Sequence, residues 1–304
     1  MTPGIVVGVG HCTVDYLGLV PRYPDITESA EIAEFSQQGG GAAATALATL
    51  AIFGAPTRFV GKVSDDHFGR FIRKGLEGLG VDTTTLVVEP DRVSAFSFSV
   101  VEMTRGRPTV FWSRGNVSPL RSEELDIDRI LDSAAMVMMD GRSLDAQLAV
   151  AMAAKQRSVP VILDTESADE TTMKLIRFTD TLISSERIAT ELTQAGELEA
   201  SLRRLQELGP KRCVITLGLE GAIGIDGDDK VHEEAACVVE EKDITGAGDV
   251  YLGALTYATL QQWSLPDAMR FASAAAGLSC QRLGARAGIP KLSQVLEIAG
   301  LAGR

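Results

Sequence analysis

The sequence predicts an α/β domain in which a mostly parallel central sheet is covered by helices on both faces, with a small β-sheet lid added. Two observations lead to this expectation. Along most of the 304 residues, short apolar runs alternate with longer segments of helical periodicity, as in parallel strands joined by helices. Two other segments alternate polar and apolar side chains residue by residue, which predicts antiparallel strands. We expect residues 1–304 to form one domain.

The first elements follow directly from this pattern. The apolar run Ile5–Val9 predicts a buried first strand. A helix of small residues is expected over Ala42–Phe53, a second strand over Thr57–Val63 and a second helix over Phe68–Leu79. Each of these helices is followed by a glycine, which suits the turn that ends a helix.

The same alternation continues toward the C-terminus. Further strands are expected at Met136–Met139, Val159–Asp164, Thr181–Ser184, Cys213–Leu217 and Ala222–Ile225. Further helices are expected at Leu144–Gln156, Ala200–Leu208, Gly248–Gln262 and Leu265–Leu283. Because strands and helices take turns, neighbouring strands should run parallel, with helices on both faces of the sheet.

Two segments, at about residues 13–36 and 92–114, depart from the strand–helix rhythm. The second contains Ser94–Val100, in which small polar and apolar residues alternate. Two antiparallel hairpins inserted into an α/β domain could form a small sheet over the mouth of an active site, that is, a lid. The alternative is that they are edge strands of the main sheet.

Composition and charge restrict the possible partners. The net charge of −12 argues against general affinity for nucleic acid or anionic membranes. The four cysteines form no CxxC pair, and the three histidines lack the spacing of zinc ligands. The N-terminal apolar run is too short to span a membrane. We therefore expect a cytoplasmic protein in a reducing compartment.

The strongest chemical signal is the segment Asp243–Asp249, which precedes an apolar helix. Gly246 and Gly248 permit a tight turn whose N–H groups converge, and the helix N-terminus adds partial positive charge. Such a nest binds an anion, for example a phosphoryl group in transfer. The Asp249 carboxylate, at the mouth of this nest, could accept a proton from an attacking hydroxyl. The alternative is an ordinary capped helix start.

The segment Asp-Ile-Thr-Gly-Ala-Gly-Asp at 243–249 resembles the D-T-x-G-A-G-D signature of ribokinase-like (PfkB) sugar kinases. Other segments that resemble the family stand in the expected order nearer the N-terminus, at 8–15, 39–46 and 61–69, so the resemblance extends over nearly the whole chain. The resemblance implies the three-layer ribokinase-like fold and an ATP-dependent kinase that phosphorylates a sugar hydroxyl. It also implies that Asp249 is the general base and that Gly246, Ala247 and Gly248 surround the transferring phosphoryl group.

The same resemblance assigns the sugar site to the N-terminal half. Asp15 matches the family's sugar-hydroxyl ligand, and Gly39, Gly40 and Gly41 match the glycine segment that opens a helix beside the sugar. Gly8-x-Gly10 after a strand also suggests a dinucleotide-binding turn. However, position 13 is Thr where that motif needs Gly, which argues against a dinucleotide.

The nucleotide site is expected after the strand at 213–217. Thr216, Gly218 and Gly221 resemble the family's T-x-G-x-x-G turn beside the ATP phosphates, and Thr245 lies in the nest segment. No Walker A lysine motif is present, so the enzyme is not of the P-loop type. We expect Mg²⁺, the nest and one arginine to offset the phosphate charge.

Two acidic residues are weaker candidates for metal binding. Glu186 keeps one acid of the family's N-x-x-E motif, whose other residues are absent, and it equally suits a solvated helix start. Asp243 is assigned by resemblance to a loop that binds a monovalent cation such as K⁺. These residues complete the expected cofactor set of ATP, Mg²⁺ and a monovalent cation.

Departures from the family pattern bear on the substrate. Gly41 and Ala44 replace the asparagines that hold sugar hydroxyls in ribokinase-type and ketohexokinase-type enzymes. The glycine segment and Gly284–Pro290 resemble bacterial sulfofructose kinase, and Arg142 matches the arginine that binds the anionic end of its sugar. A planar guanidinium suits a sulfonate or phosphate. Against this, the lysine that precedes the glycine segment in that enzyme is absent. The alternative for Arg142 is a structural ion pair.

Three functions remain open from the sequence. The first is phosphorylation of a sugar or sugar derivative, including a ketose or an anionic ketose such as sulfofructose. The second is a nucleoside kinase of the same fold, and the third is a non-catalytic sugar-binding descendant. An intact Asp249 and nest favour an enzyme, since a binding protein needs no base. Exposed lid strands also predict a homodimer that forms through the lid.

Overall fold

A computed structural model describes residues 4–104 and 107–303. Its main sheet comprises β1 (Ile5–Val9), β4 (Thr57–Val60), β9 (Ala134–Met139), β10 (Val161–Thr165), β11 (Thr181–Ser185), β12 (Arg212–Thr216), β13 (Ala222–Ile225) and β14 (Val231–Glu234). In the described part of the chain these eight strands have the order β14-β13-β12-β11-β10-β9-β1-β4. The strands from β12 to β4 pair in parallel, whereas β13 and β14 add an antiparallel edge.

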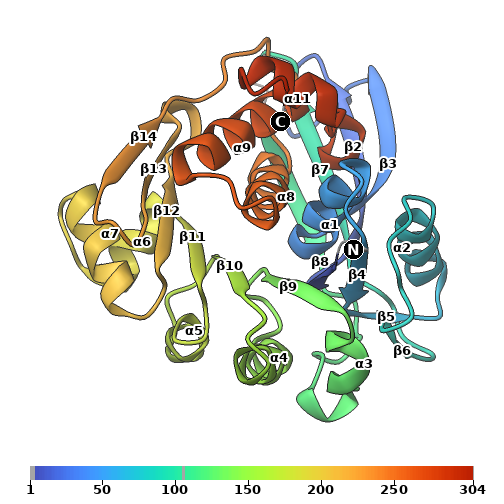
Figure 1. The fold of residues 1–304 in the computed structure, drawn as a ribbon. Coiled ribbons are helices and arrows are strands. Elements are labelled where there is room, and N and C mark those ends of the chain that lie inside the picture. The colour runs from blue at the N-terminus through green and yellow to red at the C-terminus, as the bar shows by residue number, and fades with distance from the viewer. Residues whose placement is uncertain (1–3, 105–106, 304) are drawn as a thin grey trace.

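Helices cover both faces of this sheet (Figure 1). They are α1 (Ala42–Ile52), α2 (His67–Glu77), α3 (Ile127–Leu131), α4 (Leu144–Gln156), α5 (Glu170–Ile176), α6 (Glu186–Thr193), α7 (Leu198–Glu207), α8 (Ala247–Leu260), α9 (Leu265–Ser279), α10 (Ala285–Gly288) and α11 (Leu292–Ile298). Alternate strand residues enter two separate hydrophobic clusters. Val6 belongs to the cluster that includes residues of α1, α8 and α9, whereas Val7 belongs to the cluster that includes residues of α4, α5 and α7. The predicted three-layer α/β architecture, a mostly parallel sheet between two layers of helices, is therefore confirmed.

The two alternating segments form a second sheet, which we call the lid sheet. It consists of β2 (Thr13–Val20), β3 (Glu34–Gly40), β7 (Phe96–Glu102) and β8 (Pro108–Ser113), in the order β3-β2-β7-β8. β2 and β3 pair antiparallel, as do β7 and β8, while β2 and β7 pair in parallel. The alternative, that these segments are edge strands of the main sheet, is wrong: within residues 4–104 and 107–303 the four strands form a sheet of their own.

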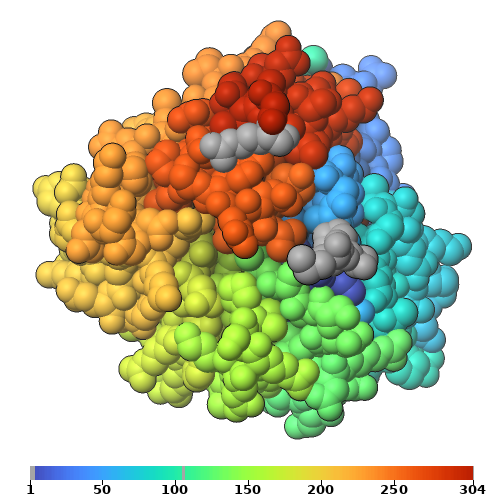
Figure 2. Space-filling view, viewed as in Figure 1, coloured from blue at the N-terminus to red at the C-terminus, as the bar shows by residue number. Residues whose placement is uncertain are grey.

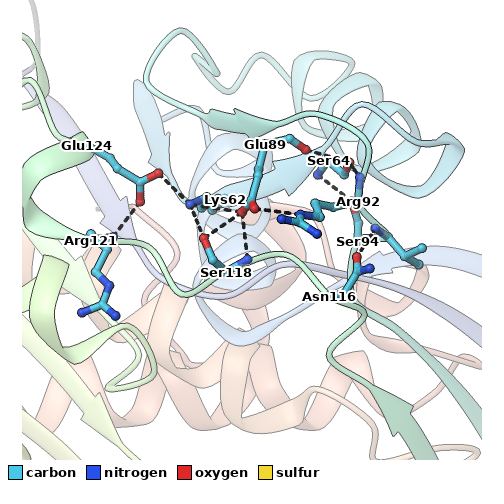
Figure 3. A network of polar contacts seen from close by, with 10 residues as sticks. Lys62, Ser64, Glu89, Arg92, Ser94, Asn116, Ser118, Arg121 and Glu124 are labelled. Carbon is cyan, nitrogen blue, oxygen red and sulfur yellow. Dashed lines mark hydrogen bonds and ion pairs between the residues drawn. The ribbon is translucent and has the colours of Figure 1, made fainter.

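A network of polar contacts fixes the base of the lid sheet (Figure 3). Lys62 lies on β5 (Lys62–Ser64), which pairs with β6 (Val87–Glu89) beside the segments that enter and leave the β7–β8 hairpin. Its Nζ lies 2.6 Å from Glu124 Oε1, 2.7 Å from Ser118 Oγ and 3.3 Å from Glu89 Oε2. The Lys62 side chain is only 6% exposed, so these contacts form where water competes little.

The C-terminal segment meets the other end of the lid sheet. Leu283 packs in one buried cluster with Leu17, Leu19 and Val101. Gln38 Nε2 donates to the Leu283 carbonyl at 2.8 Å. Figure 1 shows the red C-terminal helix α11 near the blue lid strands β2 and β3, and in Figure 2 red and blue atoms adjoin on the same side of the molecule. The segment after α9 thus packs against the lid sheet.

The structure corrects some predicted boundaries. The strand expected over Thr57–Val63 divides at Gly61, where a Cβ would lie 2.5 Å from the Phe59 ring, and its second part pairs with β6. The helix expected over Leu265–Leu283 ends at Ser279. In the part of the chain that is described, no helix is long and apolar enough to cross a membrane.

Candidate active site

Asp140, at the carboxyl end of β9, organises the edge of the sheet where the predicted site residues meet. Its Oδ2 accepts the His11 N–H at 2.6 Å and the Ala43 N–H at 3.3 Å. Its Oδ1 accepts the Arg142 N–H at 3.0 Å and Gln147 Nε2 at 2.8 Å. This buried carboxylate therefore connects the end of β1, the first turn of α1 and the loop after β9.

Asp15 lies on the face of the lid sheet that looks toward this edge. Cross-strand pairing places Gln38, Asp15, Ser97 and Trp112 in one row on one face of the four strands. Asp15 Oδ1 accepts hydrogen bonds from Ser97 Oγ at 2.7 Å and Thr13 Oγ1 at 2.8 Å. Its Oδ2 has no hydrogen-bond partner among the described residues, which leaves it able to accept a substrate hydroxyl.

The predicted glycine segment packs too tightly for side chains. A Cβ on Gly40 would lie 1.7 Å from Asp15 Oδ2, and a Cβ on Gly39 would lie 2.0 Å from Nη1 of Arg286. Gly41 precedes α1 with φ 89°, a conformation that glycine adopts readily. Arg286 Nη2 also donates to the Gly40 carbonyl at 3.2 Å. The segment is thus held between Asp15 on one face and a guanidinium on the other.

Asp243 closes the loop that carries the predicted anion nest. Its Oδ1 accepts the backbone N–H and the hydroxyl of Thr245, at 2.9 and 2.6 Å. Its Oδ2 accepts the Gly284 N–H at 2.8 Å. Gly246 then adopts φ 74°, and α8 begins at Ala247. Asp243 is 1% exposed and both its oxygens are engaged, so its participation in a monovalent-cation site stays a prediction.

Asp249 lies in the first turn of α8, close to several other acids. Its pKa is raised to about 7, chiefly by burial and further by the nearby carboxylates of Glu166, Asp140 and Asp15, while Arg142 opposes the rise. A carboxylate with such a pKa can take up a proton at neutral pH, as a general base must. Its oxygens form no hydrogen bond within the described residues, so they are available to a substrate.

Sequence reasoning missed Asp164 and Glu166, as it did Asp140. Asp164 lies near the end of β10 and Glu166 directly follows this strand, beside the carboxyl end of β9. Burial raises the pKa of Asp164 well above its usual range, and the charge of Asp249 adds to this effect. Ligands of open parallel sheets bind at the carboxyl ends of strands. An acid at the end of a predicted strand was therefore the signal that could have identified these residues as members of the site.

Of the predicted nucleotide residues, Thr216, Gly218, Gly221 and Gly248 line a cavity of about 410 Å³, whereas Thr245 and Gly246 do not line it. Thr216, Gly218 and Gly221 contribute from the β12–β13 turn, and Ala247 and Gly248 contribute from the start of α8. Small residues of α9 form another wall, including Ala276 and Gly277. Gly221 has φ 101°, and a Cβ there would lie 2.0 Å from the Glu234 carbonyl oxygen, so this turn requires glycine. The cavity therefore joins the predicted nucleotide turn to the anion nest.

Two arginines stand near the acceptor end of the site. Arg142 forms an ion pair with Glu166, and both side chains are about half exposed. Arg114, which the sequence prediction did not include, stacks over the Trp112 ring with its Cζ 5.5 Å from the centroid. Burial lowers the pKa of His11, and the charges of Arg142 and Arg114 lower it further, so both lie within electrostatic range of His11.

Glu186 lies at the carboxyl end of β11, directly after Ser185, which pairs with Thr216 of the predicted nucleotide turn. It is the first residue of α6, is exposed, and follows β11. Across the residues that the structure describes, no group of three or more His, Cys, Asp or Glu side chains could by itself hold a metal ion. A role of Glu186 in metal binding stays a prediction.

Comparisons with known proteins agree with this geometry. The model of the pfkB family of carbohydrate kinases matches residues 5–292. The chain is 27% identical over 288 residues to the ribokinase of Lactococcus lactis, with 94% of each chain covered. It is 22% identical over 310 residues to the 5-dehydro-2-deoxygluconokinase of Halalkalibacterium halodurans, covering 95% of this chain and 92% of that one.

Solved structures give the same result. The structure of Arabidopsis thaliana ribokinase complexed with ribose and ATP superimposes with a TM-score of 0.83 at 26% identity, covering 98% of this chain and 99% of that one. The expected sulfofructose kinase or ketohexokinase branch is not confirmed, because these relatives are named ribokinase and 5-dehydro-2-deoxygluconokinase.

The raised pKa of Asp249 predicts how its replacement changes stability. An aspartate that titrates near 3.9 unfolded and near 7 folded makes the protein less stable as pH rises through that interval. Asp249→Asn removes the charged form, so its gain in stability over wild type should be large at pH 8 and clearly smaller at pH 5, because most of the wild-type loss occurs above pH 5. Urea unfolding at both pH values measures this.

The helix-capping Asp169 provides the control, because the Thr172 N–H lowers its pKa. Asp169→Asn should gain no stability at pH 8. A gain for Asp249→Asn that is the same at both pH values would contradict a raised pKa at position 249.

Proposed function

The chain belongs to the pfkB family of carbohydrate kinases, and we propose that it transfers the γ-phosphoryl group of ATP to a hydroxyl of an anionic sugar derivative. The observation that supports kinase chemistry most strongly is the position of Asp249. This acid with a pKa of about 7 lies beside the anion nest, where the cavity of Thr216, Gly218 and Gly221 meets the acceptor side. A binding protein has no need of a base there.

The residues divide the reaction into binding, activation and charge stabilisation. Asp15 and the glycine segment bind the acceptor hydroxyls. The Asp249 carboxylate takes the proton from the hydroxyl that attacks the γ-phosphorus, which leaves ADP as the other product. The N–H groups of Ala247 and Gly248, with the α8 N-terminus, stabilise negative charge on the transferring phosphoryl group. Enclosure by the lid sheet would exclude water, which otherwise competes as the acceptor.

Mg²⁺ fits the acids at this edge. The ion usually takes one or two protein carboxylates, with phosphate oxygens and waters completing its shell, so a three-acid cage is unnecessary. Asp164 and Glu166 are the carboxylates that would hold it. They lie close together, since the charge of Glu166 contributes to the raised pKa of the buried Asp164. Bound between them and the nucleotide, the ion would offset phosphate charge. Glu186 is a further candidate.

The two acceptor-side arginines support an anionic acceptor. Neutral sugars offer only hydroxyls, for which an arginine gains little over water. Arg114 has no acidic partner among the described residues and stacks on Trp112, which shares a lid face with Asp15. Arg142 could exchange Glu166 for a substrate anion. A ketose carrying a sulfonate, as in sulfofructose, or a sugar acid, as in the name of the Halalkalibacterium relative, has the required charge.

A screen of acceptors tests the proposed function. ADP release should be measured with MgATP and panels of neutral sugars, sugar acids, sulfosugars and nucleosides. The proposal expects the highest kcat/KM within the anionic sugars. Best activity with nucleosides would favour a nucleoside kinase of the same fold, and the absence of acceptor-dependent ADP release would indicate a non-catalytic binding protein.

Replacement of the base should abolish turnover while preserving binding. Asp249→Asn keeps the shape of the side chain but loses its proton affinity, so kcat should fall by ~10²–10⁴-fold with little change in the affinity for MgATP. In the wild type, kcat/KM should rise with pH to a plateau above about 7, where Asp249 is deprotonated. A variant with near wild-type kcat would remove Asp249 from this role.

The arginines should discriminate between acceptors. Arg114→Ala and Arg142→Ala should each raise KM for the anionic acceptor by about tenfold or more, because a charge-assisted hydrogen bond contributes roughly 1.5–3 kcal/mol. The KM for a neutral ketose such as fructose should change little. Arg142→Lys should restore only part of the loss, since it presents a point charge in place of a planar fork. Equal effects on both acceptors would mean that the arginines are structural.

We also propose that the chain forms a homodimer through the lid sheet. The face opposite Asp15 exposes the side chains of Phe35 by 60%, Phe98 by 50% and Phe111 by 63%. Phe98 and Phe111 are directly paired across the strands, and Tyr16 stacks on Phe98 with centroids 5.2 Å apart. A second copy would bury this aromatic face from water.

Sedimentation tests the dimer. The wild type should sediment as a dimer at micromolar concentration, and Phe98→Asp should sediment as a monomer, because dimerisation would bury an unpaired charge. A monomeric wild type would contradict the proposal. So would a dimer that is insensitive to both Phe98→Asp and Phe111→Asp.

A further inference from the structure

One basic side chain lines the nucleotide cavity. Among the described residues that surround this space, Arg107 is the only base and Glu241 the only acid. The other lining groups are backbone, hydroxyl, thiol and apolar groups. Arg107 forms no ion pair within the described chain, so its guanidinium carries an uncompensated charge at a cavity of about 410 Å³. This residue was not part of the nucleotide site expected from the sequence.

Arg107 comes from the lid sheet and not from the main domain. It immediately precedes β8, at the end of the β7–β8 hairpin farthest from the paired residues Phe96 and Ser113 at the hairpin base. The same two strands carry Ser97 and Trp112, which lie in the acceptor-side row with Asp15. A single hairpin therefore contacts both the acceptor side and the nucleotide cavity.

The lid sheet that carries the hairpin contacts C-terminal segments near the anion nest. Val101, near the end of β7, packs in the buried cluster with Leu283. Lys242, which directly precedes the nest loop, forms an ion pair with Glu34 of β3. Arg107 thus approaches the cavity from a lid sheet that is docked on the same C-terminal segment as the nest.

A positive charge at this cavity would offset the negative charge that surrounds the nucleotide site. The protein has a net charge of −12, and the acids Asp164, Glu166 and Asp249 crowd the edge of the sheet near the nest. A nucleotide triphosphate adds further negative charge. Backbone N–H groups contribute partial charges only, so a full positive charge at the cavity would increase the affinity for phosphate much more than the affinity for base or ribose.

We infer that Arg107 binds the phosphate chain of the nucleotide and that the lid sheet thereby contributes to the nucleotide site as well as to the acceptor site. A guanidinium suits this task because its planar fork can donate two hydrogen bonds to phosphate oxygens. This inference rests on the proposed use of ATP. It adds Arg107 to the proposed nucleotide site and gives the lid sheet a direct role in nucleotide binding.

Calorimetric titration of the full-length protein, without an acceptor, tests the inference. MgATP, MgADP and adenosine are titrated into wild type, Arg107→Ala, Arg107→Lys and Arg22→Ala. Arg22 is a matched control, since it is an exposed lid arginine that pairs with Glu28 and does not line the cavity. Circular dichroism and thermal unfolding of each variant show whether the fold is retained.

The loss of affinity in Arg107→Ala should depend on whether the ligand carries phosphate groups. Arg107→Ala should weaken MgATP about tenfold, equal to ~1.4 kcal/mol, should weaken MgADP similarly or less, and should leave adenosine unchanged. Arg107→Lys should recover part of the MgATP affinity, and Arg22→Ala should match wild type. The loss should shrink as the salt concentration rises, because ions screen an exposed charge.

Two results would overturn the inference. Unchanged MgATP affinity in Arg107→Ala would show that the arginine does not contact the nucleotide. An equal loss for MgATP and adenosine would show that it only shapes the cavity. Failure of the proposed function is distinguishable from both, since wild type would then bind no MgATP in the same titration or would release no ADP in the acceptor screen.

Discussion

The Asp140 carboxylate is the contact on which the geometry of the site depends. Four N–H groups from separate segments converge on its two oxygens, from His11, Ala43, Arg142 and Gln147. Because the Asp140 carboxylate is charged and buried, its four hydrogen bonds are strong, and its loss would leave several N–H donors without partners. Gly10 has to be glycine for this reason, since a Cβ there would lie 2.3 Å from the Asp140 carboxyl carbon. The turn into the lid sheet and the start of α1 are therefore fixed together.

A protein with a net charge of −12 that acts on ATP has to manage negative charge locally. We propose that it uses backbone N–H groups at the Gly246–Gly248 turn and at Gly218 and Gly221. A Cβ on Gly246 would lie 2.2 Å from the Ala285 Cβ, and one on Gly221 would lie 2.0 Å from the Glu234 carbonyl oxygen. The acids that remain at this edge have a chemical consequence. Burial, together with repulsion from the other acids, raises the pKa of Asp249 to about 7, so the environment that opposes phosphate binding would also prepare Asp249 for its proposed role as base.

How far the sequence predicts this site depends on how local each signal is. Asp249, Asp15 and the glycine turns belong to short motifs in which turn geometry and chemistry lie within a few residues, and the structure places all of them around one edge. Asp140 and Asp164 were missed because each is a single acid after an apolar strand, and only the order of β9 and β10 in the sheet brings them together. The Arg142–Glu166 pair and the approach of Arg107 to the nucleotide cavity also join segments that are distant in sequence, so no local pattern could predict them. The break at Gly61 depends on the Phe59 ring, a contact that apolar periodicity does not reveal.

The central claim is that Asp249 acts as a base in one direct transfer and not as a nucleophile that carries the phosphoryl group. The stereochemistry at phosphorus distinguishes these mechanisms. ATP made chiral at the γ-phosphorus with oxygen isotopes and sulfur is turned over with the best acceptor, and the configuration of the product is determined. A single in-line displacement by the acceptor hydroxyl inverts the configuration, which is the result we expect. Retention would indicate two successive displacements through a phosphorylated enzyme, and would contradict the role assigned to Asp249.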